Sequence, residues 1–289
     1  MTTDVRSPLI SARELYEELN APSHSTRVLD VRWSLTEPDG SEAYAAGHIP
    51  GAVYVDLETD LSDHSIPGRG RHPLPSGRDL QAALRRWGVD DGSRVVLYDD
   101  WNAAGSSRGR WVLLAAGLTD VVVLDGGWRA WTREGLPVHE GPVVPDPGSV
   151  HLTYDDLDSG VLRTLTPDET LDLAARGRLL DARAPERFSG AAEPIDPVAG
   201  HIPGARNLPF TSVLTADGTF GTPDAIREAV SQALGSPPPG GVVGAYCGSG
   251  VTAAVLLTAL EHAGHDATAL YPGSWSEWAS SGREVETGP

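Results

Sequence analysis

An internal repeat constrains the fold of this 289-residue chain more than any other feature of its sequence. The segment from Ala46 to Ala52, Ala-Gly-His-Ile-Pro-Gly-Ala, recurs without change from Ala199 to Ala205. Other landmarks pair up between the two halves at nearly the same spacing: Asp30-Val31-Arg32 with Asp181-Ala182-Arg183, Tyr98 with Tyr246, and Trp128 and Trp131 with Trp275 and Trp278. A period of roughly 150 residues is too long for a solenoid of short repeats, so we predict two copies of one globular domain.

Within each copy, short apolar runs alternate with helical patterns. Four runs in the first copy predict buried strands, at 27–31, 52–55, 95–98 and 121–124. Capping boxes that begin at Ser11 and Thr166 predict two helix starts. The alternation predicts an α/β fold in which each domain is a mainly parallel sheet with helices on both faces. Ligands are expected beyond the carboxyl ends of the strands.

Proline and glycine gather between the two copies, in the segment Gly-Pro-Val-Val-Pro-Asp-Pro-Gly at 141–148. Such a segment cannot continue a helix or a central strand. We therefore predict an N-terminal domain at 1–140, a linker at 141–160 and a C-terminal domain at 161–289.

The charge balance excludes several classes of partner. The chain has 22 basic residues, all of them arginine, against 40 acidic ones, and its net charge is −18. Binding to nucleic acid needs a basic face, so no nucleic-acid partner is expected. The longest apolar runs fall well short of the ~20 residues of a membrane span. The first residues, Met1 to Arg6, carry no secretory signal, so the expected location is the cytoplasm.

The chain has a single cysteine, Cys247, which excludes an intrachain disulfide, a cysteine-based metal site and a Cys-x-x-Cys redox pair. An isolated cysteine is most often a small buried hydrophobe. Here, however, it lies between a predicted strand at 241–246 and a predicted helix at 251–260. Its loop is rich in glycine, so backbone N–H groups and the helix start can favour the thiolate. We therefore predict that Cys247 is a nucleophile. Phosphatase chemistry is disfavoured because 247–254 contains no basic residue.

These features together look like a tandem-domain rhodanese sulfurtransferase. The resemblance rests on the duplicated Asp-x-Arg and Gly-His-Ile-Pro-Gly-Ala segments, on Gly-Ser-Trp-Ser-Glu-Trp at 273–278, and on the loop cysteine of the second copy. It covers nearly the whole chain. Within the family, Cys-Gly-Ser-Gly-Val-Thr at 247–252 is similar to the loop of 3-mercaptopyruvate sulfurtransferases, whereas thiosulfate-preferring relatives usually carry basic residues after the cysteine.

The resemblance implies that one copy is catalytic and the other degenerate. Asp99 stands where the first copy should have its cysteine, and a carboxylate cannot carry sulfane sulfur. Catalysis is therefore assigned to the second copy. The N–H groups of its loop are expected to hold the substrate and the sulfur. The loop residues concerned are Gly248, Gly250, Val251 and Thr252.

Further site residues follow from the resemblance. Arg187 matches the arginine that binds the anionic substrate, the alternative being a surface salt bridge. The mercaptopyruvate branch usually has another arginine in a Glu-Pro-Arg segment, but Ile195 stands there in this chain. That departure weakens the case for mercaptopyruvate.

In the mercaptopyruvate branch the loop serine, here Ser249, is grouped with a histidine and a carboxylate from the first domain. The candidates are His72, which could also be an ordinary surface histidine, and either Glu58 or Asp56. Trp33 resembles a tryptophan that lines the cleft in relatives.

The predicted function is sulfur transfer from 3-mercaptopyruvate, a small anionic donor, through a Cys247 persulfide to a thiol or cyanide acceptor. The acceptor could be a thioredoxin-like protein. No metal or organic cofactor is implied. Two alternatives stay open: a thiosulfate sulfurtransferase, and a non-catalytic persulfide carrier or redox sensor.

Overall fold

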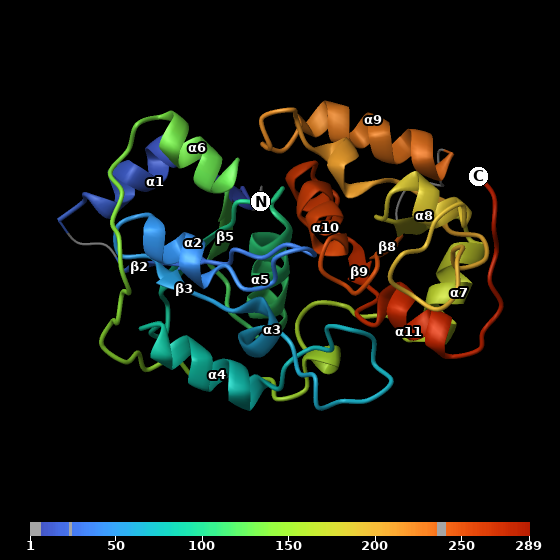
Figure 1. Cartoon of the computed structure of the whole chain (residues 1–289), viewed down its shortest axis with the longest axis horizontal. Helices are drawn as coiled ribbons and strands as arrows, with labels where there is room; N and C mark the ends of the chain where they lie inside the picture. The colour runs from blue at the N-terminus through green and yellow to red at the C-terminus, as the bar shows by residue number, and fades with distance from the viewer. Residues whose placement is uncertain (1–6, 23–24, 236–240) are drawn as a thin grey trace, which may run out of the picture.

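The computed structural model describes residues 7–22, 25–235 and 241–289 and contains two α/β domains (Figure 1). The sheet of the first domain has the strand order β1-β5-β4-β2-β3, and all of its pairings are parallel. Its strands are β1 (Leu9–Ile10), β2 (Thr26–Asp30), β3 (Val53–Tyr54), β4 (Arg94–Tyr98) and β5 (Val121–Leu124). The four strands predicted for this copy are β2 to β5, within one residue at each end.

The sheet of the second domain repeats this arrangement without the first edge strand. Its order is β7-β6-β8-β9, again with parallel pairing throughout. The strands are β6 (Leu179–Asp181), β7 (Arg206–Asn207), β8 (Val243–Tyr246) and β9 (Thr268–Leu270). Both sheets place the ends of their central strands, Tyr98 and Tyr246, next to the loops that the sequence singled out.

Helices cover both faces of each sheet. The first domain has α1 (Ala12–Leu19), α2 (Ser41–Ala46), α3 (Leu57–Asp60), α4 (Gly77–Arg86), α5 (Ala104–Ala115) and α6 (Gly127–Arg133). The second has α7 (Pro167–Ala175), α8 (Pro185–Ser189), α9 (Pro223–Leu234), α10 (Ala253–His262) and α11 (Ser274–Ser280), with a 3-10 turn η2 (Phe210–Val213), and a further 3-10 turn, η1 (Leu157–Ser159), precedes it. Both predicted capping boxes are present, at the N-termini of α1 and α7.

The alternation of side chains along the strands explains how both faces are covered. Val96 of β4 packs in one cluster with Trp131 of α6, whereas its neighbour Leu97 packs with Leu113 of α5 on the other face. In the second domain Tyr246 packs with Trp275 of α11, and Ala245 lies on the opposite face among residues of α9 and α10. The predicted fold class is confirmed.

Helices α5 and α10 pack against each other where the domains meet (Figure 1). One buried apolar cluster runs continuously from the first sheet to the second. The predicted linker, 141–160, follows the surface of the first domain: Gly148 N donates to Arg85 O over 2.8 Å and Val150 N to Val89 O over 3.2 Å. The boundaries at 140 and 161 stay predictions.

Candidate active site

Cys247 follows β8 and opens the loop that leads to α10. The residue is buried, with 2% of its surface exposed, and the N–H of Gly250 donates to its Sγ atom over 3.2 Å. Gly250 has a φ of +81°, a conformation that favours glycine because other residues meet steric strain there. The backbone of Cys247 is fixed from α11, since its N–H donates to Ser274 Oγ and its carbonyl accepts from Trp275 N. The loop thus holds the sulfur at the carboxyl end of the sheet.

A cavity of about 180 Å³ lies beside Cys247 and is lined by both domains. The predicted loop residues Gly248, Val251 and Thr252 line it, whereas Gly250 does not. The other lining residues are Trp33, Leu35, Arg71 and Trp101 of the first domain, and Ala182, Arg183, Ala184, Arg187, Phe210, Cys247 and Ser249 of the second. A larger cavity of about 830 Å³ lies near Asp158 and contains neither Cys247 nor Ser249, so the smaller one is the candidate site.

Ser249, His72 and Glu58 form a chain of hydrogen bonds across the domain interface. His72 Nδ1 lies 2.7 Å from Ser249 Oγ, and His72 Nε2 lies 3.0 Å from Glu58 Oε1. Asp56, the alternative carboxylate, instead caps α3 by accepting from the N–H groups of Glu58 and Thr59. Of the two candidates, the structure therefore brings Glu58 to the histidine.

The protonation of this chain follows from its surroundings. Burial raises the pKa of Glu58, but the hydrogen bond and charge of His72 and the hydrogen bond from Trp33 outweigh it and bring the pKa to about 2. Trp33 Nε1 donates to Glu58 Oε1 over 2.6 Å. Burial lowers the pKa of His72 below its usual 6.5, although Glu58 opposes that shift.

Because the Glu58 carboxylate is ionised, it can only accept, and His72 must donate to it from Nε2. A neutral His72 then offers the lone pair of Nδ1 to the hydroxyl of Ser249. The three side chains can therefore take a proton at the Ser249 hydroxyl and return it there.

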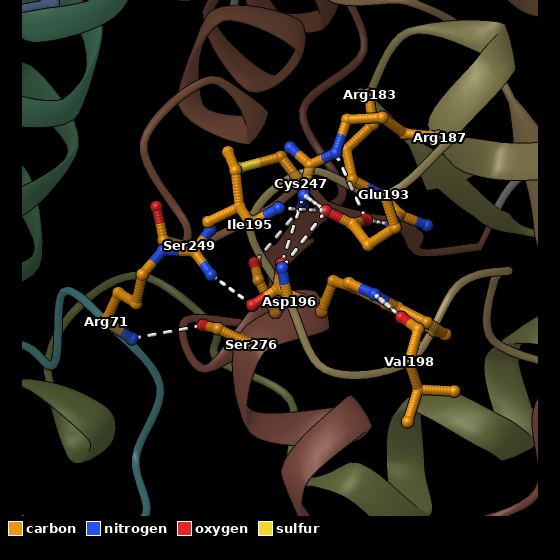
Figure 2. A network of polar contacts seen from close by, with 12 residues as sticks. Arg71, Arg183, Arg187, Glu193, Ile195, Asp196, Val198, Cys247, Ser249 and Ser276 are labelled. Carbon is orange, nitrogen blue, oxygen red and sulfur yellow. Dashed lines mark hydrogen bonds and ion pairs between the residues drawn. The ribbon is translucent and has the colours of Figure 1, made fainter. Parts of the chain in front are cut away.

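Arg187 lines the cavity, as its prediction requires, and is held by carboxylates of its own domain. Its Nη2 atom lies 2.7 Å from Glu193 Oε1 and 3.0 Å from Asp196 Oδ2 (Figure 2). Arg183 differs, because its guanidinium pairs with the buried Asp181 at 2.6 Å and stacks on Trp275 at 4.5 Å. The first copy has the same arrangement although it has no cysteine, so Arg183 has a structural role in its domain.

Two arginines of the first domain reach the site without having been predicted. Arg71 lines the cavity and forms an ion pair with Asp196 of the second domain (Figure 2). Arg108 of α5 is fully buried and donates to the carbonyls of His72, at 3.0 Å, and Leu61, at 3.2 Å. Burial lowers the pKa of Arg108 to about 10. Neither lies in a motif, and the only signal for Arg71 was its position beside His72.

The first copy has a carboxylate in place of the sulfur. Asp99 is buried and accepts three hydrogen bonds, from Trp101 N at 2.8 Å and from the N–H and hydroxyl of Ser106 at 2.8 and 2.6 Å. Both of its oxygens therefore accept hydrogen bonds from its own loop.

Within 7–22, 25–235 and 241–289, no group of three or more histidine, cysteine, aspartate or glutamate side chains is placed to hold a metal ion. None of the helices described has the length and apolar character that a membrane crossing requires.

The model of the rhodanese-like domain matches the chain twice, at residues 11–134 and 166–281. The chain is 54% identical to the putative thiosulfate sulfurtransferase SseB of Mycobacterium tuberculosis over 94% of both chains. It is 43% identical to the probable 3-mercaptopyruvate sulfurtransferase of Pseudomonas aeruginosa, over 97% of this chain and 98% of that one.

Two solved structures of 3-mercaptopyruvate sulfurtransferases are also similar to this chain. The structure of the 3-mercaptopyruvate sulfurtransferase SseA from Escherichia coli superposes with a TM-score of 0.79 at 30% identity, over 93% of this chain and 99% of that one. The 3-mercaptopyruvate sulfurtransferase from Leishmania major gives a TM-score of 0.81 at 30% identity, over 96% of this chain and 75% of that one. Both domains, the repeat and the relatives lead to one conclusion: the chain belongs to the rhodanese family.

Proposed function

We propose that this chain is a sulfurtransferase that takes sulfur from 3-mercaptopyruvate and carries it as a persulfide on Cys247. The loop geometry supports this role, because the Cys247 sulfur lies beside the cavity and accepts a hydrogen bond from Gly250 N. The cavity beside it has room for a small donor. The names of the relatives supply the reaction class.

The proposed first step balances as follows. The Cys247 thiolate attacks the donor sulfur and forms a sulfur–sulfur bond, while the carbon–sulfur bond of the donor breaks and its electron pair passes to the enolate of pyruvate. The donor thiol contributes one proton, and the enolate needs one to become pyruvate. A thiol or cyanide acceptor then attacks the outer sulfur and regenerates the Cys247 thiolate.

The observation that carries the choice of donor is the hydrogen-bonded chain of Ser249, His72 and Glu58. Ser249 can accept the thiol proton, pass it to His72 Nδ1 and return it to the enolate. Its hydroxyl also lies beside the cysteine, where it can stabilise charge that develops on the enolate oxygen. Thiosulfate carries no proton to be moved and leaves as sulfite, so this machinery has a use with mercaptopyruvate only.

Thiosulfate is the second candidate donor. It is favoured by the name of the 54% identical relative and by the two guanidinium groups, Arg71 and Arg187, that line the cavity. The cysteine loop itself has no basic residue, but these arginines bring positive charge to the site from other segments.

The test compares both donors in the wild type and in Ser249→Ala, with cyanide as the acceptor. We expect the higher kcat/KM with mercaptopyruvate, and a larger loss with mercaptopyruvate than with thiosulfate in the variant. If thiosulfate is the better donor of the wild type, the thiosulfate assignment replaces this one. Equal losses with both donors would reduce Ser249 to a residue that shapes the loop.

For the acceptor inside the cell we propose only its chemical class, a thiol. A small thiol suits a cavity of this size, and a thioredoxin-like protein would have to present its thiol at the mouth that Leu35, 47% exposed, helps to line. Persulfide that forms on Cys247 but never turns over with thiols or cyanide would identify a carrier or sensor instead.

A further inference from the structure

The side chain of Arg108 in α5 is fully buried, which charged side chains almost never are unless they are paired. Its Nη2 atom donates to the backbone carbonyls of Leu61, at 3.2 Å, and His72, at 3.0 Å. Its Nη1 atom reaches the carbonyl of Gly250, in the second domain, at 3.5 Å. Because the N–H of Gly250 donates to Cys247 Sγ, one guanidinium connects the backbone of His72 with the cysteine loop.

The guanidinium of Arg108 has no carboxylate partner within 7–22, 25–235 and 241–289, and its Nε atom has no hydrogen-bond partner there. Asp158 acts on it only through its charge, and Asp158 is itself paired with Arg69 at 2.6 Å. A buried cation without a counter-ion costs free energy, and burial accordingly lowers the pKa of Arg108 to about 10. The negative charge of the Cys247 thiolate opposes that shift more than any other group does.

The other charged side chains around the cysteine loop are balanced by partners. Three arginines line the cavity, and each is paired with a carboxylate of the second domain. The pairs are Arg71 with Asp196 and Arg187 with Glu193 (Figure 2), and Arg183 with Asp181. In the first domain, the Glu58 carboxylate contacts His64 and the ring nitrogen of His72 that does not face Ser249. Among the arginines described around this loop, Arg108 therefore carries the unbalanced charge.

This unbalanced charge acts on two groups that the reaction uses. It attracts the thiolate of Cys247, since opposite charges in a buried site interact strongly. Burial is the main cause of the lowered pKa of His72, and the charge of Arg108 adds to it. The proposed sulfur transfer needs an anionic Cys247 and a neutral His72, so one cation favours both protonation states.

We propose that Arg108 is a positioning residue whose buried, unbalanced charge favours the Cys247 thiolate and neutral His72 together. The inference rests on the proposed function and deepens it, since it names a group that biases the protonation of the site. Arg108 does not line the cavity, and the hydrogen bonds described for it go to backbone carbonyls. It therefore acts through Cys247 and His72 rather than on the sulfur donor.

Alkylation of Cys247 by iodoacetamide tests the charge without any sulfur transfer, because the reagent is neutral and the chain has one cysteine. Only the thiolate reacts, so the rate rises with pH to a limit. In Arg108→Gln we expect the half-limiting rate at a pH about one unit higher than in the wild type, and an unchanged limit. Below that pH, alkylation should be about tenfold slower. Glutamine keeps two N–H donors and removes the charge, so the variant separates the charge from the hydrogen bonds.

Arg110→Gln is the matched control. Arg110 lies on the same helix and is also buried, but its guanidinium is paired across the domain interface with Glu261, at 2.7 and 2.8 Å. Its loss removes an arginine of α5 that is balanced, so the pH dependence of alkylation should equal that of the wild type.

Arg108→Met is the second charge-free variant, and it replaces Arg108→Gln if thermal unfolding shows that the glutamine variant is not folded. A wild-type pH dependence of alkylation in folded Arg108→Gln overturns the proposal. If Arg108→Met alone shows the shift, the role belongs to the hydrogen bonds and the charge is again excluded. An equal shift in Arg110→Gln would also overturn the proposal, because any disturbance of α5 would then suffice.

Steady-state kinetics tests the effect on His72. In Arg108→Gln the acid limb of kcat/KM with mercaptopyruvate should move to higher pH, because His72 loses a charge that keeps it neutral. An acid limb that stays in place or moves to lower pH overturns the joint role. A wild type that prefers thiosulfate would contradict the proposed donor, but it would leave the shift in alkylation, and the inference for Cys247, standing.

Discussion

The loops that follow the central strands β4 and β8 share the same backbone hydrogen bonds but differ in the side chain at their centre. In the first domain Trp128 N donates to Asp99 O over 2.9 Å, and in the second Trp275 N donates to Cys247 O over 3.0 Å. The tyrosine before each loop accepts an N–H of the repeated segment over 3.2 Å in both domains. The duplicated sequence therefore keeps one backbone frame and allows its central side chain to change.

The side chain at the centre decides what each loop can do. Asp99 uses its oxygens on three donors of its own loop, which also holds Asn102 and Ala103 at positive φ. Cys247 accepts from Gly250 N alone among the described residues, and it faces a cavity. Beside the carboxylate, which is bound by its own loop, lies a cavity of only about 90 Å³, whereas the sulfur with few partners lies beside one of about 180 Å³.

Each domain also covers the loop of the other, and the two covers differ. Asp217, on the second domain's loop after η2, pairs with Arg129 beside the Asp99 loop at 3.4 Å. The corresponding loop of the first domain, after α3, brings Arg71 and His72 to the Cys247 loop. The candidate site is thus built from parts of both domains, although the first domain has no cysteine of its own.

The largest effect on activity is expected from replacing the cysteine that distinguishes the second loop from the first. Cys247→Ser should abolish transfer from every donor, with less than a few per cent of activity left, because the chain has no second thiol. Asp99→Cys in the same background should restore none of it, because no histidine is among the described residues that line the cavity beside Asp99. Mass spectrometry after donor treatment should show one added sulfur on the wild type and none on either variant. Turnover by the double variant would mean that a cysteine in the shared backbone conformation is sufficient for sulfur transfer.

The next effect tests what the first domain contributes. His72→Ala should lower kcat with mercaptopyruvate about a hundredfold or more, the usual range for loss of a general acid–base group. His64 provides the control, since it also contacts Glu58, at 3.0 Å, but is half exposed and lies outside the chain to Ser249. His64→Ala should keep at least half of the wild-type kcat. Equal losses in the two variants would remove His72 from the proposed proton path.

The strands, the helix starts and the loop of Cys247 could be predicted from the sequence because their signals are local and occur in both copies. Strand runs, both capping boxes and the position of Cys247 depend on residues close together in the chain. Ser249, His72 and Glu58 were reached through the resemblance, and the choice between Glu58 and Asp56 needed the helix cap that uses Asp56. Arg71 was missed because its role depends on Gly70 packing on Gly273 of the other domain, which no local pattern encodes.

The pH dependence of kcat/KM tests the protonation state that we propose for His72. The proposed path needs neutral His72, and burial lowers the His72 pKa, so kcat/KM with mercaptopyruvate should hold until the pH falls below 6.5 and then decline. Glu58→Gln removes a charge that raises this pKa, which moves the acid limb to lower pH. It should also lower the rate about tenfold, because the amide no longer fixes which nitrogen of His72 carries the proton. An acid limb that stays in place or moves to higher pH would contradict the assignment of Glu58.

The smallest effect concerns the Asp99 loop. Burial raises the pKa of the Asp99 carboxyl above its usual 3.8, so the native state binds this proton more tightly than the unfolded chain does. The stabilisation from this group is complete below 3.8 and is lost as the pH rises through the higher native value. Asp99→Asn removes that dependence and leaves one amide N–H facing a donor of the loop, a cost on the order of 1 kcal/mol. The variant should therefore unfold at a lower temperature than the wild type in acid, and the difference should shrink as the pH is raised. Transfer activity should stay within twofold, since Asp99 lies outside the open site. A gap in unfolding temperature that widens with pH would show that the charged carboxylate stabilises this loop, and the two loops would then be anion sites of the same kind.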